Sequence, residues 1–362
     1  MIVKLFTFWR LGLFLVTYLG SLVLPKIENG GLGAIGKGHT FNFWTSWAQW
    51  DGGHYFGIAE SGYLLFSDYA FFPLFPFLVR VVNLLLGNLI LSGLIVSNIA
   101  FLIFLLIFFK VIKEKYSPKV AQLTIGTFLV FPTTFFAVAF YSESLFLLLC
   151  ALTFLLLSRK KFLFAAIATS LASLTRSPGV ILIISIFYSY FATIHFKPRL
   201  IDKRFLYILV APFGFIFYGL YLFFKVNDPF KFLTIQSSWE RSVIDPITTF
   251  VSYIWVIATG QQRPINDYFD LALTLLFLAI LILGRRKIPS SWWIFSMAVI
   301  LLPASFGTLT SMPRYLLSSL GSFVIIAQYL KERPRLRIVL WSLSLFSQAV
   351  LATRFILGYW VA

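Results

Sequence analysis

Long apolar runs with very few charged side chains recur along the whole chain, and they constrain its fold more than any other feature. A helix needs about 20 mainly apolar residues to cross a bilayer. The runs that reach or approach this length predict an all-α polytopic membrane protein with about eleven transmembrane helices, within residues 5–24, 90–112, 119–140, 144–158, 162–175, 180–194, 205–224, 269–283, 291–306, 315–330 and 338–357. Two shorter runs, residues 71–87 and 247–258, are flanked by polar loops and are expected to be re-entrant or interfacial helices.

The composition excludes a soluble globular protein. Hydrophobic residues make up 59% of the chain and charged residues 12%, whereas soluble domains hold about 25% charged residues. No internal repeat, low-complexity tract or soluble domain is visible, so residues 1–362 are expected to form a single membrane domain. The first apolar run shows no small-residue cleavage site and is expected to be an uncleaved helix rather than a signal peptide.

The basic residues decide what the formal net charge of +17 means. A nucleic-acid-binding protein also carries such an excess, but as a basic face on a soluble surface. If the N-terminus is cytoplasmic, most Lys and Arg residues fall in inward-facing loops, where Glu114, Asp202 and Glu332 are the only acidic residues. This distribution follows the positive-inside rule. We therefore expect contact with membrane lipids and no nucleic-acid partner.

In the same topology, the polar motifs that loop composition does not explain fall on the outer side. They lie at residues 50–51, 141–144, 175–179, 225–267 and 311–315. Inner loops are short and merely basic, as connectors should be. The arrangement predicts an extracytoplasmic active site that works on a substrate held at the edge of the bilayer.

The segment from Trp47 to Pro76 is the most polar long stretch of the first half. Asp51 stands between Trp50, which offers a flat apolar wall, and the pair Gly52-Gly53, which lets the backbone approach a ligand closely. If residues 54–60 are helical, Trp50, Gly53, Gly57 and Glu60 share one face and His54 lies beside them. The alternative for Asp51 is a structural role, either as a helix N-cap or as a charge on a surface loop.

Three runs in this segment resemble the PIG-V family of GPI mannosyltransferases and its prokaryotic relatives. They are Trp50-Asp51, the run Ile-Ala-Glu-Ser-Gly-Tyr at residues 58–63, and the run Phe-Phe-Pro-Leu-Phe-Pro at residues 71–76. The resemblance implies a GT-C-like fold and transfer of a sugar, expected to be mannose, from a polyprenyl-phosphate donor to a lipid-linked or glycan acceptor. It also implies an inverting, metal-independent mechanism without a cofactor, in which Asp51 is the general base.

Sugar transfer requires a base for the attacking hydroxyl, for which a carboxylate within hydrogen-bond reach is suited. Glu60 is an alternative base or an acceptor-positioning group, unless it is only a solvated helix residue. His54 is expected either to contact phosphate or acceptor or to be a structural interfacial histidine. Asp68 is expected to cap the turn into the following aromatic segment.

The departing lipid phosphate needs cations, and the planar guanidinium of arginine can bind two of its oxygens. Arg176, Arg314 and Arg241 are the candidates, since an arginine near a membrane span is costly unless it meets a counter-charge or a lipid phosphate. Snorkelling to the interface is the alternative. In the family, an Arg-Ser pair before a Gly recurs, usually with Asn where this chain has Pro178.

Further residues are expected to position the substrate. Glu143 would pair with one of these arginines, the alternative being that Ser142 caps a helix with Glu143 in its first turn. Trp239 would stack on a sugar, and Tyr315 follows Arg314 directly. An interfacial belt of aromatic and basic residues is the competing explanation for Trp239 and Arg241.

A metal or nucleotide cofactor is not predicted. The histidines His39, His54 and His195 are far apart in sequence, and Cys150 is the only cysteine. The glycine-rich residues 30–33 lack the following Lys-Ser/Thr of a phosphate-binding loop.

Two rival functions remain at this stage. One is a lipid-linked sugar flippase or small-molecule transporter, although such carriers often show two similar halves and midplane charges. The other is a GT-C enzyme that acts on protein or lipid A. The absence of Asn-x-Ser/Thr acceptors and the chain length favour a prokaryotic source and hence the plasma membrane.

Overall fold

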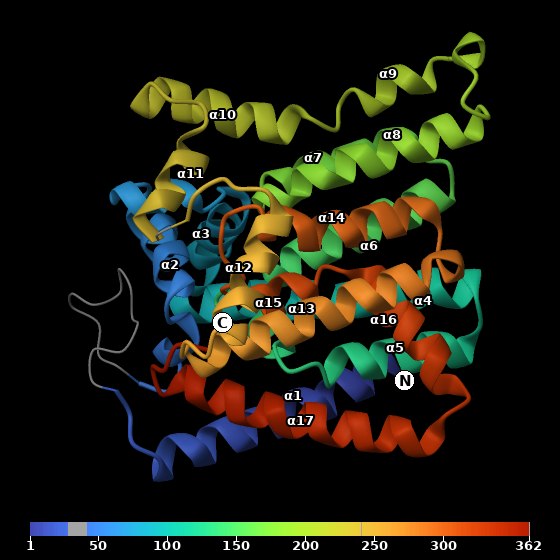
Figure 1. Ribbon diagram of the computed structural model, residues 1–362. Coiled ribbons are helices and arrows are strands. Elements are labelled where there is room, and N and C mark those ends of the chain that lie inside the picture. The colour runs from blue at the N-terminus through green and yellow to red at the C-terminus, as the bar shows by residue number, and fades with distance from the viewer. Residues whose placement is uncertain (28–41, 240, 362) are drawn as a thin grey trace.

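The computed structural model describes residues 1–27, 42–239 and 241–361, and within these ranges the chain forms helices and no strand (Figure 1). His39 and the glycine-rich residues 30–33 lie outside the described residues. Four described helices are long and apolar enough to cross a membrane: α1 (Ile2–Val23), α4 (Leu89–Lys115), α13 (Ile265–Leu283) and α17 (Pro334–Ile356). The all-α membrane fold is therefore confirmed, whereas the expected number of about eleven spans is not.

Shorter apolar helices complete the bundle. They are α5 (Pro118–Leu129), α6 (Glu143–Ser158), α7 (Phe162–Ser173), α8 (Ile181–Thr193), α10 (Phe213–Val226), α14 (Ser290–Ala304) and α16 (Leu320–Lys331). Most of them run side by side with the long helices, and α1 lies along α17 (Figure 1). Phenylalanine rings fill the contacts between α4, α5 and α16, where the ring of Phe128 lies 5.1 Å from Phe104 and 4.7 Å from Phe323.

Three of the predicted spans are interrupted. The expected helix 119–140 ends at Leu129, and the chain continues as the short 3-10 helix η4 (Thr134–Val138), which is fully buried. Pro132 disfavours helix at the residue before it, and the hydroxyl of Thr134 donates to the carbonyl of Phe128 over 2.6 Å. Because of this break, residues 139–143 lie at the polar end of the bundle.

The other two interruptions lie in the expected spans 315–330 and 205–224. The expected span 315–330 consists of α15 (Met312–Leu316) and α16, which are separated by a turn at residues 317–319. The expected span 205–224 consists of α9 (Arg204–Ile208) and α10, with Pro212 between them. A proline lacks the N–H that a continuous helix requires, so α10 starts anew after it.

The basic loops and the polar motifs lie at opposite ends of the bundle. At one end Arg159 pairs with Glu114 over 2.9 Å, the Tyr116 hydroxyl donates to the carbonyl of Lys287 over 3.0 Å, and the N-terminus of α1 lies nearby (Figure 1). At the other end lie the short helices α2 (Asp51–Ser61), α3 (Leu74–Leu86), α11 (Lys231–Thr234), η7 (Ile235–Trp239) and α12 (Pro246–Ala258). The separation matches the predicted loop arrangement, and the side of the membrane that each end faces stays a prediction.

Candidate active site

Asp51 is the first residue of α2, and a strained residue precedes it. Trp50 has φ +54° and ψ −122°, which is rare for a residue with a side chain, and its ring packs edge-on against Trp360 with centroids 4.9 Å apart. Residues 54–60 are helical, as the sequence analysis assumed. Strain of this kind persists only where surrounding contacts hold it.

Those contacts come from the segment that follows η4. The Tyr141 hydroxyl donates to the carbonyl of Gln49 over 2.7 Å, and the Tyr55 and Ser142 hydroxyls share a hydrogen bond of 2.6 Å. A Cβ atom on Gly52 would lie 3.1 Å from the Tyr141 ring and 3.2 Å from the carbonyl oxygen of Phe140. Gly52 therefore allows close packing of α2 on this segment.

The Asp51 carboxylate forms an ion pair with Arg314. Arg314 Nη2 lies 2.5 Å from Asp51 Oδ2, and the exposed fractions of the two side chains are 7% and 26%. Burial alone would raise the pKa of Asp51, but the charge and hydrogen bond of Arg314, with His54 and Arg176 further away, hold this pKa below its usual value. Asp51 is therefore ionised at neutral pH and faces a cation rather than serving as a helix N-cap.

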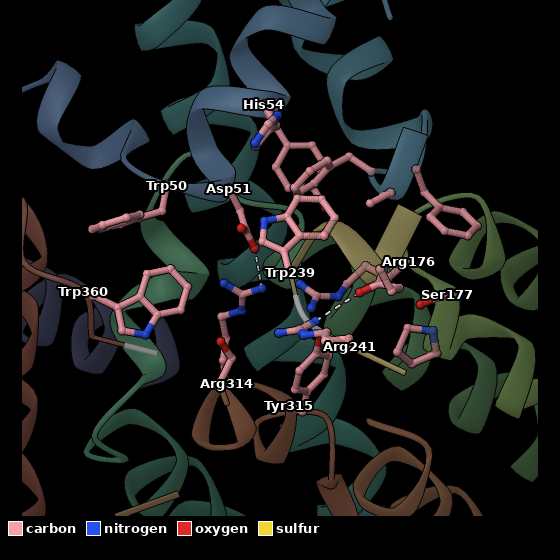
Figure 2. A pocket seen from close by; sticks show the side chains of 17 residues that line it. Trp50, Asp51, His54, Arg176, Ser177, Trp239, Arg241, Arg314, Tyr315 and Trp360 are labelled. Carbon is pink, nitrogen blue, oxygen red and sulfur yellow. Dashed lines mark hydrogen bonds and ion pairs between the residues drawn. The ribbon is translucent and has the colours of Figure 1, made fainter. Parts of the chain in front are cut away.

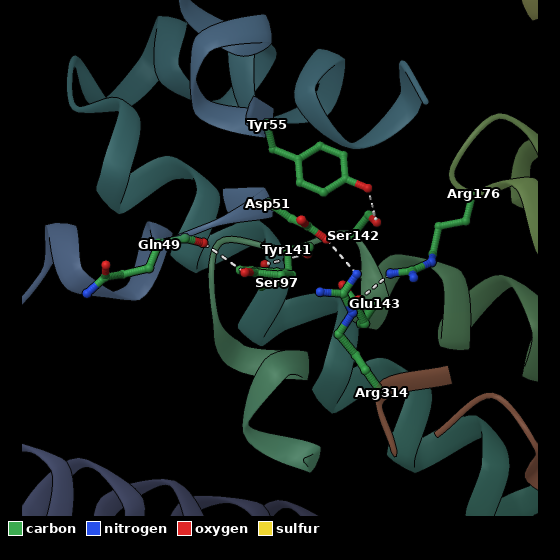
Figure 3. Close-up of polar contacts among 9 residues, drawn as sticks. All are labelled: Gln49, Asp51, Tyr55, Ser97, Tyr141, Ser142, Glu143, Arg176 and Arg314. Carbon is green, nitrogen blue, oxygen red and sulfur yellow. Dashed lines mark hydrogen bonds and ion pairs between the residues drawn. The ribbon is translucent and has the colours of Figure 1, made fainter. Parts of the chain in front are cut away.

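Glu143 joins Arg314 to Arg176. Its Oε1 atom contacts Arg176 Nη1 and lies 3.0 Å from Arg314 Nε, while Oε2 is buried without a hydrogen-bond partner among the described residues. Figure 3 shows the four charged groups in a row, alternating in sign. Glu143 also begins α6, where the helix dipole favours an anion. The expected pairing with an arginine is confirmed. Ser142 also occupies the N-cap position with Glu143 in the first turn, as in the alternative, but the Ser142 side chain makes no capping hydrogen bond.

A cavity of about 350 Å³ opens above this row of charges (Figure 2). Arg176, Arg241 and Arg314 line it together with Asp51. Its other described lining residues are Trp50, His54, Tyr55, Ala70, Phe71, Phe72, Ser177, Pro178, Gln236, Trp239, Ser311, Tyr315 and Trp360. Four of the predicted polar segments, residues 50–51, 175–179, 225–267 and 311–315, thus contribute to one cavity although they are far apart in sequence.

The cavity has a positive electrostatic character. Burial would raise the pKa of the Tyr315 phenol, but Arg241, Arg314 and Arg176 together lower it below its usual value. Arg241 is held by Gln236, whose Oε1 accepts from its Nη1 over 3.3 Å, and Arg176 lies 5.7 Å from the centre of the Tyr315 ring. An anion is the ligand that such a cavity favours.

His54 and Trp239 form one wall. The Nδ1 atom of His54 lies 2.9 Å from Asp68 Oδ1, and its ring stacks on Phe71 with centroids 4.6 Å apart. Asp68 also accepts the backbone N–H of Leu65 over 2.8 Å, so the expected turn cap is confirmed. Asp68 thereby orients the imidazole and leaves Nε2 for a ligand. Trp239 is 40% exposed and contacts His54 edge-on.

Glu60 does not line this cavity. It lies at the other end of α2, about 14 Å along the helix axis from Asp51 at 1.5 Å per residue, and it lines a second cavity. Tyr55, Gln236 and Trp360 line the first cavity without having been predicted there. Gln236 lies in the predicted outer segment 225–267, whereas nothing in the sequence singled out Tyr55 or Trp360 as residues of this cavity.

No group of three or more potential metal-ligating His, Cys, Asp or Glu side chains occurs in the described part of the chain. The charged and imidazole side chains of the site are the carboxylates of Asp51 and Glu143, the imidazole of His54 and the guanidinium groups of Arg176, Arg241 and Arg314.

Comparison with known structures shows similarity to the oligosaccharyltransferase of Archaeoglobus fulgidus. The form tethered to an acceptor peptide matches with 12% identity and a TM-score of 0.50 over 97% of this chain and 55% of that one. The apo form matches with 12% identity and a TM-score of 0.49 over 98% and 56%. This chain thus spans about 55% of the oligosaccharyltransferase. The likeness concerns the fold, which is of the GT-C class.

Sequence comparison identifies the family. No curated protein matches the chain. The family model described as mannosyltransferase (PIG-V) matches residues 25–237, which is more than half of the chain and includes Trp50, Asp51 and Arg176. The predicted resemblance is confirmed: the chain belongs to the PIG-V mannosyltransferase family and is an integral membrane protein with a GT-C-like fold.

Proposed function

We propose that this protein transfers a mannose from a polyprenyl-phosphate donor to a lipid-linked or glycan acceptor, with Asp51 as the general base. The observation that carries the proposal is the contact of Asp51 with a cavity lined by three arginines. A base and a phosphate-binding site are the two elements that displacement of a sugar from a phosphate requires.

The phosphate of the donor binds to Arg176, Arg241 and Arg314, and His54 adds a hydrogen bond through Nε2. The acceptor hydroxyl oxygen attacks the anomeric carbon, the bond from that carbon to the phosphate oxygen breaks, and the phosphate keeps the electron pair. The hydroxyl proton passes to Asp51. Charge grows on the phosphate in this step, where guanidinium groups stabilise it most. A single displacement inverts the anomeric centre.

Arg314 links the general base to phosphate binding, because it contacts Asp51 and also lines the cavity. While Arg314 contacts Asp51, the low pKa of the carboxylate makes it a weak proton acceptor. A donor phosphate competes for the same guanidinium and draws it toward the cavity. The pKa of Asp51 then rises, because burial is no longer offset to the same extent. Donor binding thus makes Asp51 a stronger proton acceptor.

Aromatic side chains hold the sugar. Trp50, Trp239 and Tyr315 line the cavity, and Trp239 is exposed enough to stack on a sugar face. Glu143 keeps Arg176 and Arg314 in place from beneath. The concentration of basic loops at the opposite end of the bundle supports an extracytoplasmic site and a cytoplasmic N-terminus, in the plasma membrane of a prokaryote.

The test uses purified protein in lipid nanodiscs, radiolabelled polyprenyl-phosphate mannose and an extract of cell lipids, with mass spectrometry of the labelled product. Asp51→Asn should lower transfer by about 10²–10⁴-fold while donor binding stays near that of the wild type; because the substitution removes the charge that pairs with Arg314, a lower unfolding temperature is also expected. A flippase would still move the donor in Asp51→Asn liposomes and would yield no product in either protein. That outcome would refute the proposal.

A further inference from the structure

A second cavity, of about 740 Å³, lies at the other end of α2. It is bounded by α2, α3, the start of α4 and residues 42–45, and it shares no lining residue with the Asp51 cavity. Its volume is within the range of about 300–1,000 Å³ that is usual for ligand sites. Nothing in the proposed chemistry uses it.

The second cavity is uncharged overall, unlike the first. Its described lining holds one acid, Glu60, and one base, Arg80. The Arg80 guanidinium is already engaged, since Nε donates to the carbonyl of Ala59 over 2.7 Å and Nη2 to that of Glu60 over 3.1 Å. It therefore satisfies the C-terminal carbonyls of α2 and is a poor binding site for a phosphate.

Carboxamide groups supply the remaining polar chemistry. Asn42 and Asn88 each accept backbone N–H bonds through Oδ1, and Asn83 Oδ1 accepts from Ser92 Oγ over 3.5 Å. Their Nδ2 groups donate no hydrogen bond to a described residue, so three amide donors are available to one ligand. Amides beside a single carboxylate suit the hydroxyl and ring oxygens of a neutral sugar.

The cavity is also lined by exposed apolar side chains. Leu84 is 81% exposed and Leu91 is 46% exposed, and Leu89 and Ile90 at the start of α4 line the cavity with them. A ligand that fills this space has a sugar at its polar end and a hydrocarbon chain beside α3 and α4. The combination describes a glycolipid.

We propose that this cavity binds the uncharged, membrane-proximal sugar of the lipid-linked acceptor. The inference rests on the proposed function for the role of the ligand, whereas the glycolipid specificity rests on the cavity alone. Since α2 carries Asp51 at one end and Glu60 at the other, the helix separates the anchoring sugar from the reacting hydroxyl by about 14 Å. The acceptor is thus held at two points, and Glu60 is an acceptor-positioning residue rather than a second base.

A direct binding experiment tests the cavity without relying on catalysis. Native mass spectrometry of the full chain in nanodiscs would compare diglucosyl-diacylglycerol with phosphatidylglycerol, for the wild type, Leu84→Trp and Leu85→Trp. Leu84 lines the cavity, whereas its neighbour Leu85 is 86% exposed and does not. The glycolipid should bind in preference to phosphatidylglycerol. In Leu84→Trp the larger side chain occupies part of the cavity and displaces the sugar, so the glycolipid affinity should fall by about tenfold, which corresponds to the loss of one or two hydrogen bonds between sugar and protein. Leu85→Trp should leave it unchanged.

Equal binding of the two lipids would identify a general phospholipid contact and overturn the proposal, as would equal effects of the two tryptophan variants. In the transfer assay, Leu84→Trp and Asn83→Leu should raise KM for the identified acceptor and leave KM for the donor unchanged. If no transfer is found with any donor but the glycolipid still binds in the cavity, the proposed function fails and the glycolipid site stands. If transfer is found but the glycolipid does not bind in this pattern, the proposed function stands and the glycolipid site is refuted.

Discussion

Replacement of Arg314 by glutamine is the most informative single perturbation of the charged row. Arg314 is 7% exposed and contacts both Asp51 Oδ2 and Glu143 Oε1, so Arg314→Gln leaves two acids without their shared cation. Removing one partner of a buried ion pair costs about 3–5 kcal/mol. Glu143 keeps Arg176, and Asp51 is 26% exposed and partly solvated, so the lower end, about 3 kcal/mol, is expected. Thermal unfolding in detergent should shift down by several degrees.

The same variant should change the pH dependence. In the wild type the pKa of Asp51 is depressed, so the stability that its charge contributes is present above its unfolded pKa and is lost only as pH falls through the lower folded value. Both stability and kcat/KM, which report the donor-free protein, should therefore be insensitive to Asp51 between about pH 5 and 7. In Arg314→Gln the charge that offsets the effect of burial is lost, so the pKa of Asp51 rises. The pH below which the remaining activity declines should therefore be higher than in the wild type.

Donor affinity supplies a third readout. A hydrogen bond to a charged group contributes about 1.5–3 kcal/mol, so loss of one guanidinium contact should weaken donor binding by about 10–100-fold. Arg337→Gln, at the basic end of the bundle, is the control and should change none of these quantities. If Arg314→Gln unfolds at the wild-type temperature and its pH–rate profile superimposes on that of the wild type, the ion pair does not organise the site.

Two further predictions concern the support of Asp51 and the sugar. Gly52→Ala places a methyl group 3.2 Å from the Phe140 carbonyl, so α2 must shift and kcat should fall by up to about 10²-fold. Gly12→Ala, where nothing lies within 4 Å, should leave kcat unchanged, and equal rates for both variants would contradict the packing argument. Trp239→Ala removes a 40% exposed ring and should raise KM for the donor about tenfold, as loss of a stacking contact of about 1 kcal/mol or more implies. An unchanged KM would assign Trp239 to the interfacial belt.

Much of the candidate site could be predicted from the sequence, because charged residues are rare in this apolar chain and are easily identified as candidates. Asp51, Arg176 and Arg314 are charges at positions where a membrane protein tolerates them only with a partner. Their meeting was expected, and the structure brings them together through Glu143. Tyr55 was not identifiable, since one more aromatic residue in a chain with 16 tyrosines carries no signal.

The position of Glu60 shows where sequence spacing is insufficient. Helical spacing placed it on the same face as Trp50, but Trp50 lies outside α2, and this helix is long enough for its two ends to line different cavities. Gly52 is a second case, since its neighbour across space is Phe140, which no local pattern connects to it.

Apolar length and loop charge are local properties, and they alone determined that this chain enters a bilayer as helices with its basic loops on one side. Where the helices break, and hence which polar motifs meet, depends on contacts between distant segments. The end of α5 at Leu129 and the packing of residues 140–141 on Gly52 fix the place of Asp51 opposite Arg314. Only the tertiary structure decided that geometry, because its energy arises between residues that are far apart in the sequence.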